Sequence, residues 1–239
     1  MNVYHTPQYQ KFRQEQAFLF SEDCLCQRPG KEPELPQGWT VCTSRYQGGL
    51  YRAARHQLLD SGDQVVYTWD NINDDGEFYR LFPHANGNHY LVFREDLYGY
   101  SVLEVETGRT MHYIPEKSWP LDGRQGEETF IWTNVAYDAA TNLLAVSGCY
   151  WACPNGTLLL DFADPLAEQD WKVWLDVQNV VDPDYDLYDD INLERFGKNG
   201  LLHFKTFSAE DGSPGGFTLP ADRILELVQE KKLEHKERG

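Results

Sequence analysis

Short runs of apolar and aromatic residues alternate with turn clusters along most of the chain. The runs have strand length and are rich in β-branched and aromatic residues, as in "QVVYTW", "HYLVFRE" and "ETFIWTNV". Clusters such as "DDG", "NGN", "LDGRQG" and "EDGSPGG" stand between or beside them and are typical of tight turns. The pattern predicts a mainly β protein built from antiparallel meanders.

Two of these runs predict different burial. "YSVLEVETG" alternates apolar with polar positions, which indicates a strand with one face in water. "GTLLLDF" is too apolar for such a strand, so we expect it to be buried on both faces.

An asparagine precedes a short apolar run three times, in "NHYLVF" (88–93), "NLLAVS" (142–147) and "NGLLHF" (199–204). Asparagine tolerates the left-handed conformation, so each is expected in the turn that opens a strand. A second echo relates "YTWDNI" (67–72) to "FIWTNV" (130–135). A recurrence of about 55 residues suggests a repeated β-meander, which is longer than the roughly 40–50 residues of a common propeller blade. We therefore expect antiparallel meander repeats that are either propeller-like, which removes exposed edges, or an open twisted sheet or β-sandwich.

Helix signals occur near the two ends. Residues 219–239 predict a C-terminal helix with a frayed end, because Pro220 suits a helix start and the last turns are basic. Its apolar stripe is Ile224, Leu225, Leu227 and Val228. Residues 7–20 are a second helical candidate, and 27–38 form a Pro/Gly-rich loop. Too few residues precede that loop to form a domain, so we expect one β-rich domain over 1–239.

The formal net charge of −17 disfavours nucleic acid and anionic membrane surfaces as partners. It favours a basic protein or a cation, although solubility alone explains it equally well. No apolar leader and no long apolar window are visible, and the five cysteines are expected to be reduced thiols, so we expect a cytoplasmic protein.

The acidic segment "VDPDYDLYDDINLE" (181–194) is the predicted partner surface. Its carboxylates repel one another unless a basic partner, a divalent cation or solvent relieves them, and its tyrosines supply amphipathic contact area. A solvated loop is the alternative. The predicted binding residues are Asp182, Asp184, Tyr185, Asp186, Tyr188, Asp189 and Asp190.

"SGCYWACP" (147–154) raises the question of a metal or redox site. In an unbroken strand Cys149 and Cys153 would lie about 13 Å apart, which is too far for one metal or one disulfide. They meet only if the chain folds back near Ala152. A four-cysteine site with Cys24 and Cys26 has poor spacing, so buried, inert thiols are the preferred interpretation.

"WDNINDDGE" (69–77) resembles the first half of a calcium loop through Asn71, Asn73, Asp75 and Gly76. Phe82 stands where such a loop needs a bidentate glutamate, so a polar turn is the preferred interpretation. The sequence thus predicts neither a metal nor a cofactor.

The chain contains none of the serine-elbow, zinc-protease, Walker or dinucleotide motifs. Four carboxylates flank aromatic strands and are the first acid–base candidates: Glu95, Asp96, Glu127 and Glu128. His84 and His89 bracket the turn "ANGN", where capping is favoured over a ligand pair.

These features favour a binding module, immunity-like or adaptor-like, whose acidic face meets a basic protein. The alternative is a carbohydrate-active hydrolase that uses two carboxylates with Trp and Tyr as stacking platforms. An accessory domain whose charge serves solubility is the third possibility.

Overall fold

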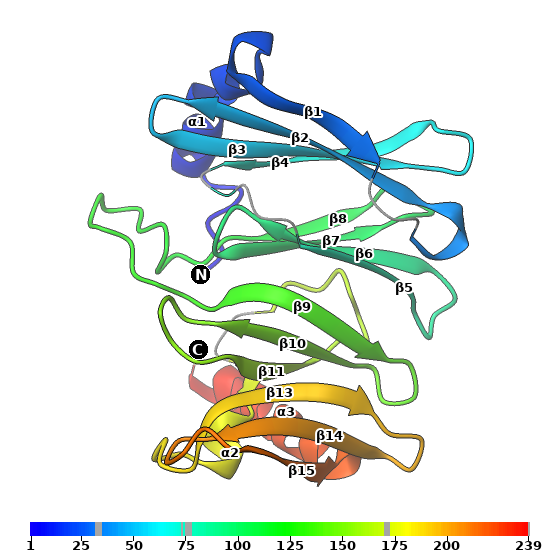
Figure 1. Cartoon of the computed structure of the whole chain (residues 1–239), viewed down its shortest axis with the longest axis vertical. Coiled ribbons are helices and arrows are strands. Elements are labelled where there is room, and N and C mark those ends of the chain that lie inside the picture. The colour runs from blue at the N-terminus through cyan, green and yellow to red at the C-terminus, as the bar shows by residue number, and fades with distance from the viewer. Residues whose placement is uncertain (32–34, 73, 75–77, 170–172, 239) are drawn as a thin grey trace. The chain divides into compact units, whose positions relative to one another are not determined.

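The computed structural model describes residues 1–31, 35–72, 74, 78–169 and 173–238. They form two compact units, which we call the N-terminal unit (Met1–Thr129) and the C-terminal unit (Phe130–Gly239). The chain is mainly β, with four antiparallel sheets and a C-terminal helix, as the sequence predicts (Figure 1). The expectation that residues 1–239 form a single domain stays a prediction.

The N-terminal unit contains two four-stranded meanders. The first consists of β1 (Leu25–Lys31), β2 (Thr40–Gly48), β3 (Tyr51–Leu59) and β4 (Val65–Ile72). The second consists of β5 (Tyr79–Pro83), β6 (His89–Glu95), β7 (Gly99–Glu104) and β8 (Thr110–Tyr113). The helical elements are α1 (Pro7–Glu15), η1 (Ala17–Phe20), η2 (Glu22–Cys24) and η3 (Pro36–Gly38).

A buried apolar cluster joins the two sheets of the N-terminal unit. Its side chains come from β2, β3 and β4 of one sheet and from β5, β6 and β7 of the other. Its members are Val41, Leu58, Trp69, Leu81, Leu91, Phe93, Leu103 and Val105. Removal of this apolar area from water is the main force that holds the two meanders together.

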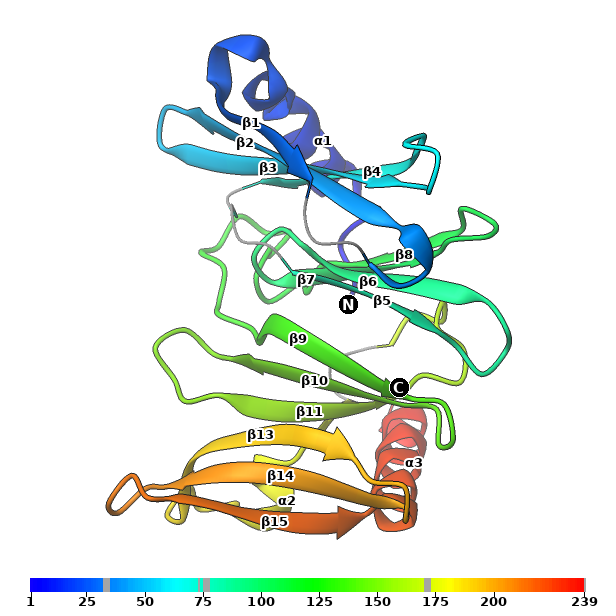
Figure 2. The ribbon, with the colours of Figure 1, turned by 45° about the vertical axis from the view of Figure 1, so that its right-hand side comes forward.

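The C-terminal unit contains a four-stranded sheet and a three-stranded sheet. The first has the spatial order β12-β11-β10-β9 and the second β13-β14-β15 (Figure 2). Their bounds are β9 (Ile131–Asp138), β10 (Leu143–Cys149), β11 (Gly156–Asp161), β12 (Leu175–Asp176), β13 (Tyr188–Phe196), β14 (Leu201–Ser208) and β15 (Pro214–Pro220). Two α-helices lie among the residues of this unit that the structure describes, α2 (Gln178–Val181) and α3 (Ala221–Arg238).

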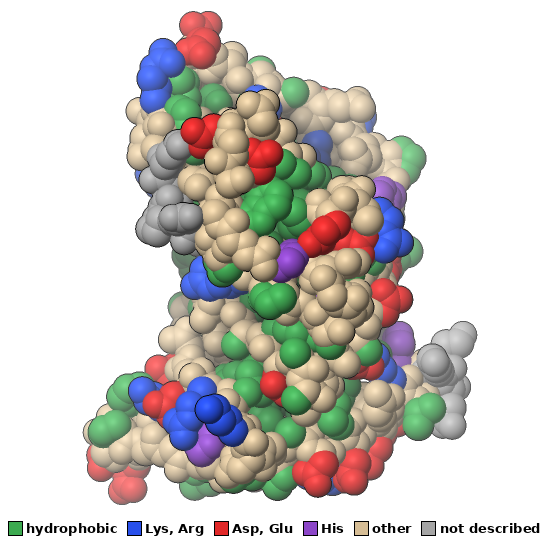
Figure 3. All heavy atoms as spheres, turned by 90° about the vertical axis from the view of Figure 1, so that its right-hand side faces the viewer, with side chains coloured by type: hydrophobic (Ala, Val, Ile, Leu, Met, Phe, Trp, Pro, Cys, Tyr) green, Lys and Arg blue, Asp and Glu red, His purple; other side chains and the backbone are tan. Residues whose placement is uncertain are grey.

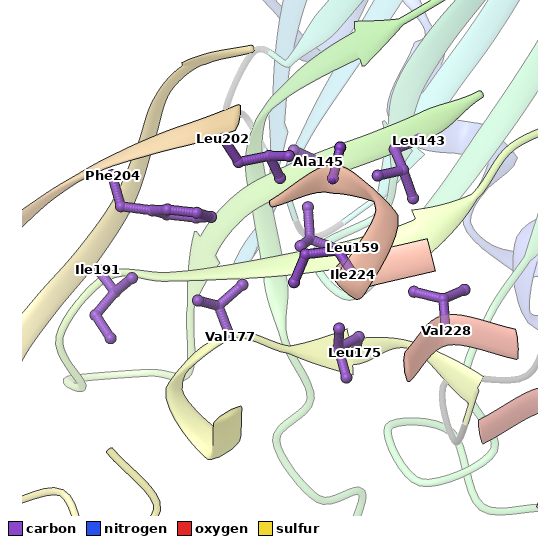
Figure 4. Close-up of a cluster of buried hydrophobic side chains, with 11 residues drawn as sticks. Leu143, Ala145, Leu159, Leu175, Val177, Ile191, Leu202, Phe204, Ile224 and Val228 are labelled. Carbon is purple, nitrogen blue, oxygen red and sulfur yellow. The ribbon is translucent and has the colours of Figure 1, made fainter. Parts of the chain in front are cut away.

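Helix α3 closes the core of the C-terminal unit. Ile224 and Val228 lie on its buried face and point into a cluster of side chains from β10 to β14 (Figure 4). Leu225 and Leu227, also in the predicted apolar stripe, pack against this cluster from partly buried positions. The predicted C-terminal helix is therefore confirmed, and its stripe is the part of the helix that meets the core.

The four sheets are open rather than closed, and the described residues form no closed propeller. The structure therefore corresponds to the open-sheet alternative. Several edge strands carry features that discourage pairing with other chains. Strand β1 contains Pro29, β12 has only two residues, and β15 begins and ends with proline.

The recurrent asparagines mark equivalent strands. Asn88, Asn142 and Asn199 stand just before β6, β10 and β14, and each of these is the second strand of its meander in chain order. Asn142 has a φ of 57°, in the left-handed region. The other echo falls on β4, the last strand of one sheet, and on β9, the first of another. That echo therefore marks no equivalent position.

The two burial predictions have different outcomes. In β11 the residues from Thr157 to Leu160 are all buried, as expected for "GTLLLDF". The expectation of a wet face for "YSVLEVETG" is wrong, because every residue of β7 is buried. Its polar positions are buried through hydrogen bonds, with Ser101 donating to Glu95 and Glu104 accepting from Tyr90.

Near the N-terminus, the helical prediction for 7–20 corresponds to α1 followed by η1. The predicted loop 27–38 is shorter in the structure, because β1 extends to Lys31 and pairs with β2 through two register shifts. Residues 32–34 lie outside the described part. No described helix is long and apolar enough to cross a membrane.

Acidic side chains are scattered rather than gathered in one place on the face of the molecule that Figure 3 shows. On the face drawn in Figure 3 they lie over both units, with basic side chains among them. Net charge alone therefore does not single out a site, and local structure has to do so.

Candidate functional site

Asp182 holds the acidic segment in shape. It follows α2 and is only 3% exposed. Its Oδ1 accepts a hydrogen bond from the backbone N–H of Asp186, at 3.1 Å, and its Oδ2 accepts from those of Leu187 and Tyr188, each at 3.0 Å. Burial raises the pKa of Asp182, but these backbone donors outweigh it, so its pKa lies below the usual value. This predicted binding residue is therefore an internal organiser of the turn.

Two other predicted binding residues also have internal contacts. Tyr188 packs its ring 5.8 Å from that of Phe217, over the core. Asp190 accepts a hydrogen bond from the backbone N–H of Asn155 at 2.6 Å. Both fix the segment against the rest of the C-terminal unit.

The remaining four predicted residues, Asp184, Tyr185, Asp186 and Asp189, are exposed. The side chain of Tyr185 is 60% exposed, and its backbone adopts a φ of 60°. Leu187, between them, is 56% exposed. The segment thus presents carboxylates and apolar surface together.

The motif "SGCYWACP" ends a strand and forms a turn. Strand β10 stops at Cys149, and the backbone N–H of Cys153 donates to the carbonyl of Tyr150 at 2.9 Å. Ala152 adopts a φ of 58°, which reverses the chain toward β11. The turn exposes Tyr150 and Trp151, the latter by 61%. The fold-back required to bring the two cysteines together is therefore present.

The expectation of buried thiols is wrong for Cys26 and Cys153, which are exposed at turns or edges of the sheets, whereas Cys149 is partly buried. Cys149 and Cys153 are free thiols. Burial raises the pKa of Cys149, and the neighbouring Cys153 and Asp190 raise it further. Within the described ranges no group of three or more His, Cys, Asp or Glu side chains is arranged to hold a metal ion. Of the calcium-like loop, Asn73, Asp75 and Gly76 lie outside these ranges.

Gly148 of this motif is required by the pairing of β10 with β9. A Cβ at this position would lie 2.1 Å from the carbonyl oxygen of Ile131 and 2.6 Å from the ring of Phe130. Gly156, its partner across the hairpin, has only an ordinary 3.8 Å neighbour.

We expect Gly148→Ala to lower the free energy of unfolding by about 1–3 kcal/mol, because the added methyl group must displace backbone. Gly156→Ala is the matched control and should cost much less. Urea unfolding of the two variants measures the difference. Equal costs would show that β9 moves aside without strain.

The acidic segment and the "YWAC" turn meet at one place in the C-terminal unit. The backbone joins them, since the N–H of Ile191 donates to the carbonyl of Asn155 at 3.0 Å. The side chains also share an environment: burial raises the pKa of Tyr150, and Asp176 and Tyr185 raise it further. We call this surface the aromatic–acidic patch and define it as Tyr150, Trp151, Asp184, Tyr185, Asp186, Leu187 and Asp189.

The sequence indicates the acidic segment of this patch but does not indicate the contribution of Tyr150 and Trp151. Tyr150 and Trp151 were visible only as parts of a cysteine motif. Two bulky aromatic residues inside a turn, outside any strand alternation, were the available signal. The position of Tyr150 near Tyr185 depends on the pairing of β10 with β11 and on the contact of β11 with β13.

Two of the acid–base candidates lie in a buried cluster of the N-terminal unit. Glu95 ends β6, and Asp96 follows it with a φ of 51°. Arg13 of α1 places its Nη1 3.0 Å from Oε1 of Glu95 and 3.3 Å from Oδ1 of Asp96. Its Nη2 donates to the carbonyl of Asp70 at 2.7 Å. The cluster therefore ties α1 to a strand of each sheet in this unit.

Glu95 is satisfied on both oxygens. Its Oε2 accepts from the hydroxyl of Ser101 at 2.6 Å and lies 3.2 Å from Nδ1 of His112. Burial raises the pKa of Glu95, but the hydrogen bond from His112 and the charge of Arg13 outweigh it, so the pKa lies below its usual value. The carboxylate of Glu95 therefore has a structural role.

Asp96 is satisfied as well. Its Oδ1 accepts from the backbone N–H of Ile72 at 2.6 Å, and its Oδ2 accepts from the hydroxyl of Tyr9. Burial raises the pKa of Asp96 to about 6; Arg13 opposes this increase and Glu95 adds to it. Glu95 and Asp96 both accept hydrogen bonds from groups inside the unit, so this cluster has a structural role.

The other two candidates, Glu127 and Glu128, are exposed on the segment after β8. Glu127 lies 3.7 Å from Nζ of Lys117, also at the surface. None of the four carboxylates supplies an observation that supports the hydrolase alternative, which stays a prediction. Within the turn "ANGN", the N–H of Asn86 donates to Nδ1 of His84 at 3.1 Å, which is the capping role expected there.

No protein-family model matches the sequence, and a search of curated proteins finds no match. Partial likeness exists to solved structures of a Synechocystis apocarotenoid oxygenase. A Trp-to-Ala variant aligns with a TM-score of 0.33 and 9% identity, and a Glu-to-Gln variant with a TM-score of 0.31 and 8% identity. The alignments cover 81% of this chain and 50% of each of those chains. Likeness at this TM-score carries no argument about function.

Proposed function

We propose that this chain is a binding protein whose aromatic–acidic patch holds a basic segment of another protein. The observation that carries the proposal is the 60% exposure of Tyr185 among three exposed carboxylates of its own segment, together with the 61% exposure of Trp151 on the turn that meets this segment. Trp and Tyr are enriched among the residues that dominate binding energy at protein interfaces.

The charge of the patch indicates the chemistry of the partner. Asp184, Asp186 and Asp189 are exposed and have no ion-pair partner among the described side chains. Arg and Lys side chains would relieve the mutual repulsion of these carboxylates and could also stack on the rings of Trp151 and Tyr185. An anionic partner would add to the repulsion, and an apolar partner would contact the rings without relieving it.

The frame under the patch supports binding because it is internally fixed. Asp182 and Asp190 hold the acidic segment through backbone hydrogen bonds. The ring of Tyr150 stacks edge-on at 5.5 Å from that of Phe130. A preorganised surface loses less conformational entropy on association than a disordered one.

The proposal is tested with peptides selected from a random library on the immobilised protein. We expect the selected peptides to be enriched in Arg and Lys. Against the strongest of them, Trp151→Ser should lower the affinity by about thirtyfold, as for an interface hot spot. Leu50→Ser, which removes a 99% exposed side chain from the N-terminal unit, is the matched control.

The charge contribution is measured with the triple variant Asp184→Asn, Asp186→Asn and Asp189→Asn. It should slow association at low salt by about tenfold, and the loss should shrink at high salt because screening removes the attraction. The triple variant Glu127→Gln, Glu128→Gln and Glu210→Gln, which removes the same number of charges outside the patch, is the control for net charge. Selected peptides without basic residues, or unchanged binding by Trp151→Ser, would refute the proposal.

A further inference from the structure

A cavity of about 190 Å³ lies in the N-terminal unit, between α1, the turn after β6 and residues 114–119. Asp96 is the one charged residue among the described side chains that line it. The carboxyl side chain is 15% exposed, so it is reachable from the cavity. The cavity is thus small, with a single acidic group in its wall.

Aromatic rings form much of the remaining wall. Tyr9, Phe12, Tyr98 and Trp119 all line the cavity. The ring of Trp119 lies 4.4 Å from that of Phe12, at 43°, and 5.5 Å from that of Tyr9, nearly perpendicular to it. Rings that meet at such angles offer both faces and edges to a ligand. Ring faces attract cations through their quadrupole.

The hydrogen bonds of Asp96 are satisfied within the unit, but two carboxylates share one positive charge. The guanidinium of Arg13 serves both Glu95 and Asp96. Burial raises the pKa of Asp96, Arg13 opposes this increase and Glu95 adds to it. The titratable and charged groups that face this carboxyl group are Tyr4, Tyr9, Arg13 and Glu95, with His112 beyond Glu95.

We propose that this cavity binds a small organic cation of the alkylammonium class, with its charge against Asp96 and its alkyl groups against Phe12, Tyr98 and Trp119. An alkylammonium ion supplies the missing positive charge and matches the aromatic wall, which a hydrated metal ion does not. The site shares no residue with the aromatic–acidic patch, and its ligand is a small free cation rather than a segment of a protein.

The test compares two probes of nearly equal shape. (2-Hydroxyethyl)trimethylammonium carries the charge, and 3,3-dimethylbutan-1-ol is its neutral isostere. Binding is followed by tryptophan fluorescence and by NMR shifts of the backbone amides of Leu97 and Gly99. We expect the cation to bind with at least tenfold higher affinity than the alcohol, with shifts centred on these amides. Equal affinities, or no binding of either probe at millimolar concentration, would overturn the proposal.

The contribution of Asp96 is measured by pH, without altering a residue on which the fold depends. Its carboxyl group is mostly protonated at pH 5 and ionised at pH 7.5, so the affinity for the cation should fall by about tenfold between pH 7.5 and 5. The alcohol should show no such change. A pH-independent affinity for the cation would exclude Asp96 as its partner.

The aromatic wall is tested with Trp119→Leu. We expect an affinity loss of about three- to thirtyfold, in the range of one cation–π contact. Phe207→Leu, which removes a 43% exposed aromatic ring from the C-terminal unit outside the aromatic–acidic patch, is the control and should leave the affinity unchanged. Equal effects of the two variants would refute the assignment of Trp119.

Discussion

Replacement of Arg13 by methionine is expected to lower the free energy of unfolding of the N-terminal unit by about 3–5 kcal/mol. The guanidinium is the shared partner of Glu95 and Asp96, and Glu95 is only 2% exposed. Methionine fills part of the space but leaves two buried carboxylates uncompensated. It also removes the donor to the carbonyl of Asp70. Hydrogen exchange of the β4 and β6 amides measures the loss for this unit separately.

The cost of Arg13→Met should decrease as the pH falls. Without the guanidinium, the carboxyl pKa values rise in the folded state above their unfolded values. Such groups contribute stability below the unfolded pKa and lose it as the pH rises through the folded pKa. The variant should therefore be closer to the wild type at pH 5 than at pH 7.5. Lys11→Met, on the same helix at a 75% exposed position, is the control and should cost under about 0.5 kcal/mol. A small, pH-independent cost of Arg13→Met would contradict this account.

Replacement of His56 by glutamine is expected to remove much of the acid sensitivity of the N-terminal unit. His56 is 1% exposed, its Nδ1 lies 2.8 Å from the hydroxyl of Thr43, and its ring stacks 4.8 Å from that of Trp69. Burial lowers the pKa of His56 to about 3, and the charges of Arg45 and Arg94 act in the same direction. The folded unit therefore holds this imidazole neutral under conditions in which an unfolded chain would protonate it.

The sign follows from this lowered pKa. A histidine whose folded pKa lies below the unfolded value of about 6.5 contributes stability above that value, and the contribution is lost as the pH falls toward the folded pKa. One unit of pKa difference corresponds to about 1.4 kcal/mol, so His56 should account for roughly 2–3 kcal/mol of the loss between pH 7.5 and 4.5. Urea unfolding at both pH values, in the wild type and in His56→Gln, gives the difference.

His5→Gln removes an exposed histidine and is the control for this measurement. It should leave the pH dependence as in the wild type. If His56→Gln and the wild type lose the same stability on acidification, the imidazole is not kept neutral and carboxylates account for the whole effect.

Local patterns in the sequence predicted the elements well, because strand and turn preferences act over a few residues. "GTLLLDF" indicated a fully buried strand, and β11 is one. The asparagines at 88, 142 and 199 identified the turns that open β6, β10 and β14. The stripe around Ile224 and Val228 indicated the helix face that enters the core. In each case the residues that form the pattern belong to a single strand, turn or helix.

The pattern was misleading where polar residues are buried by long-range partners. Ser101 and Glu104 made β7 look half exposed, yet both are buried in hydrogen bonds. The residues next to Ser101 and Glu104 in the sequence do not indicate that these side chains form hydrogen bonds with Glu95 and Tyr90. The same holds for Asp182, which reads as one of many surface acids but is held by backbone donors of its own turn.

The sequence by itself determined a mainly β chain with a C-terminal helix and an acidic segment, because these depend on composition and on short-range periodicity. Only the tertiary structure decided which residues share a site. Strand pairing brings the turn that holds Tyr150 to the acidic segment that holds Tyr185, and the docking of α1 brings Arg13 to Glu95 and Asp96. Such contacts depend on packing between segments that are far apart in the chain, where a change of register by one residue would turn each side chain to the opposite face.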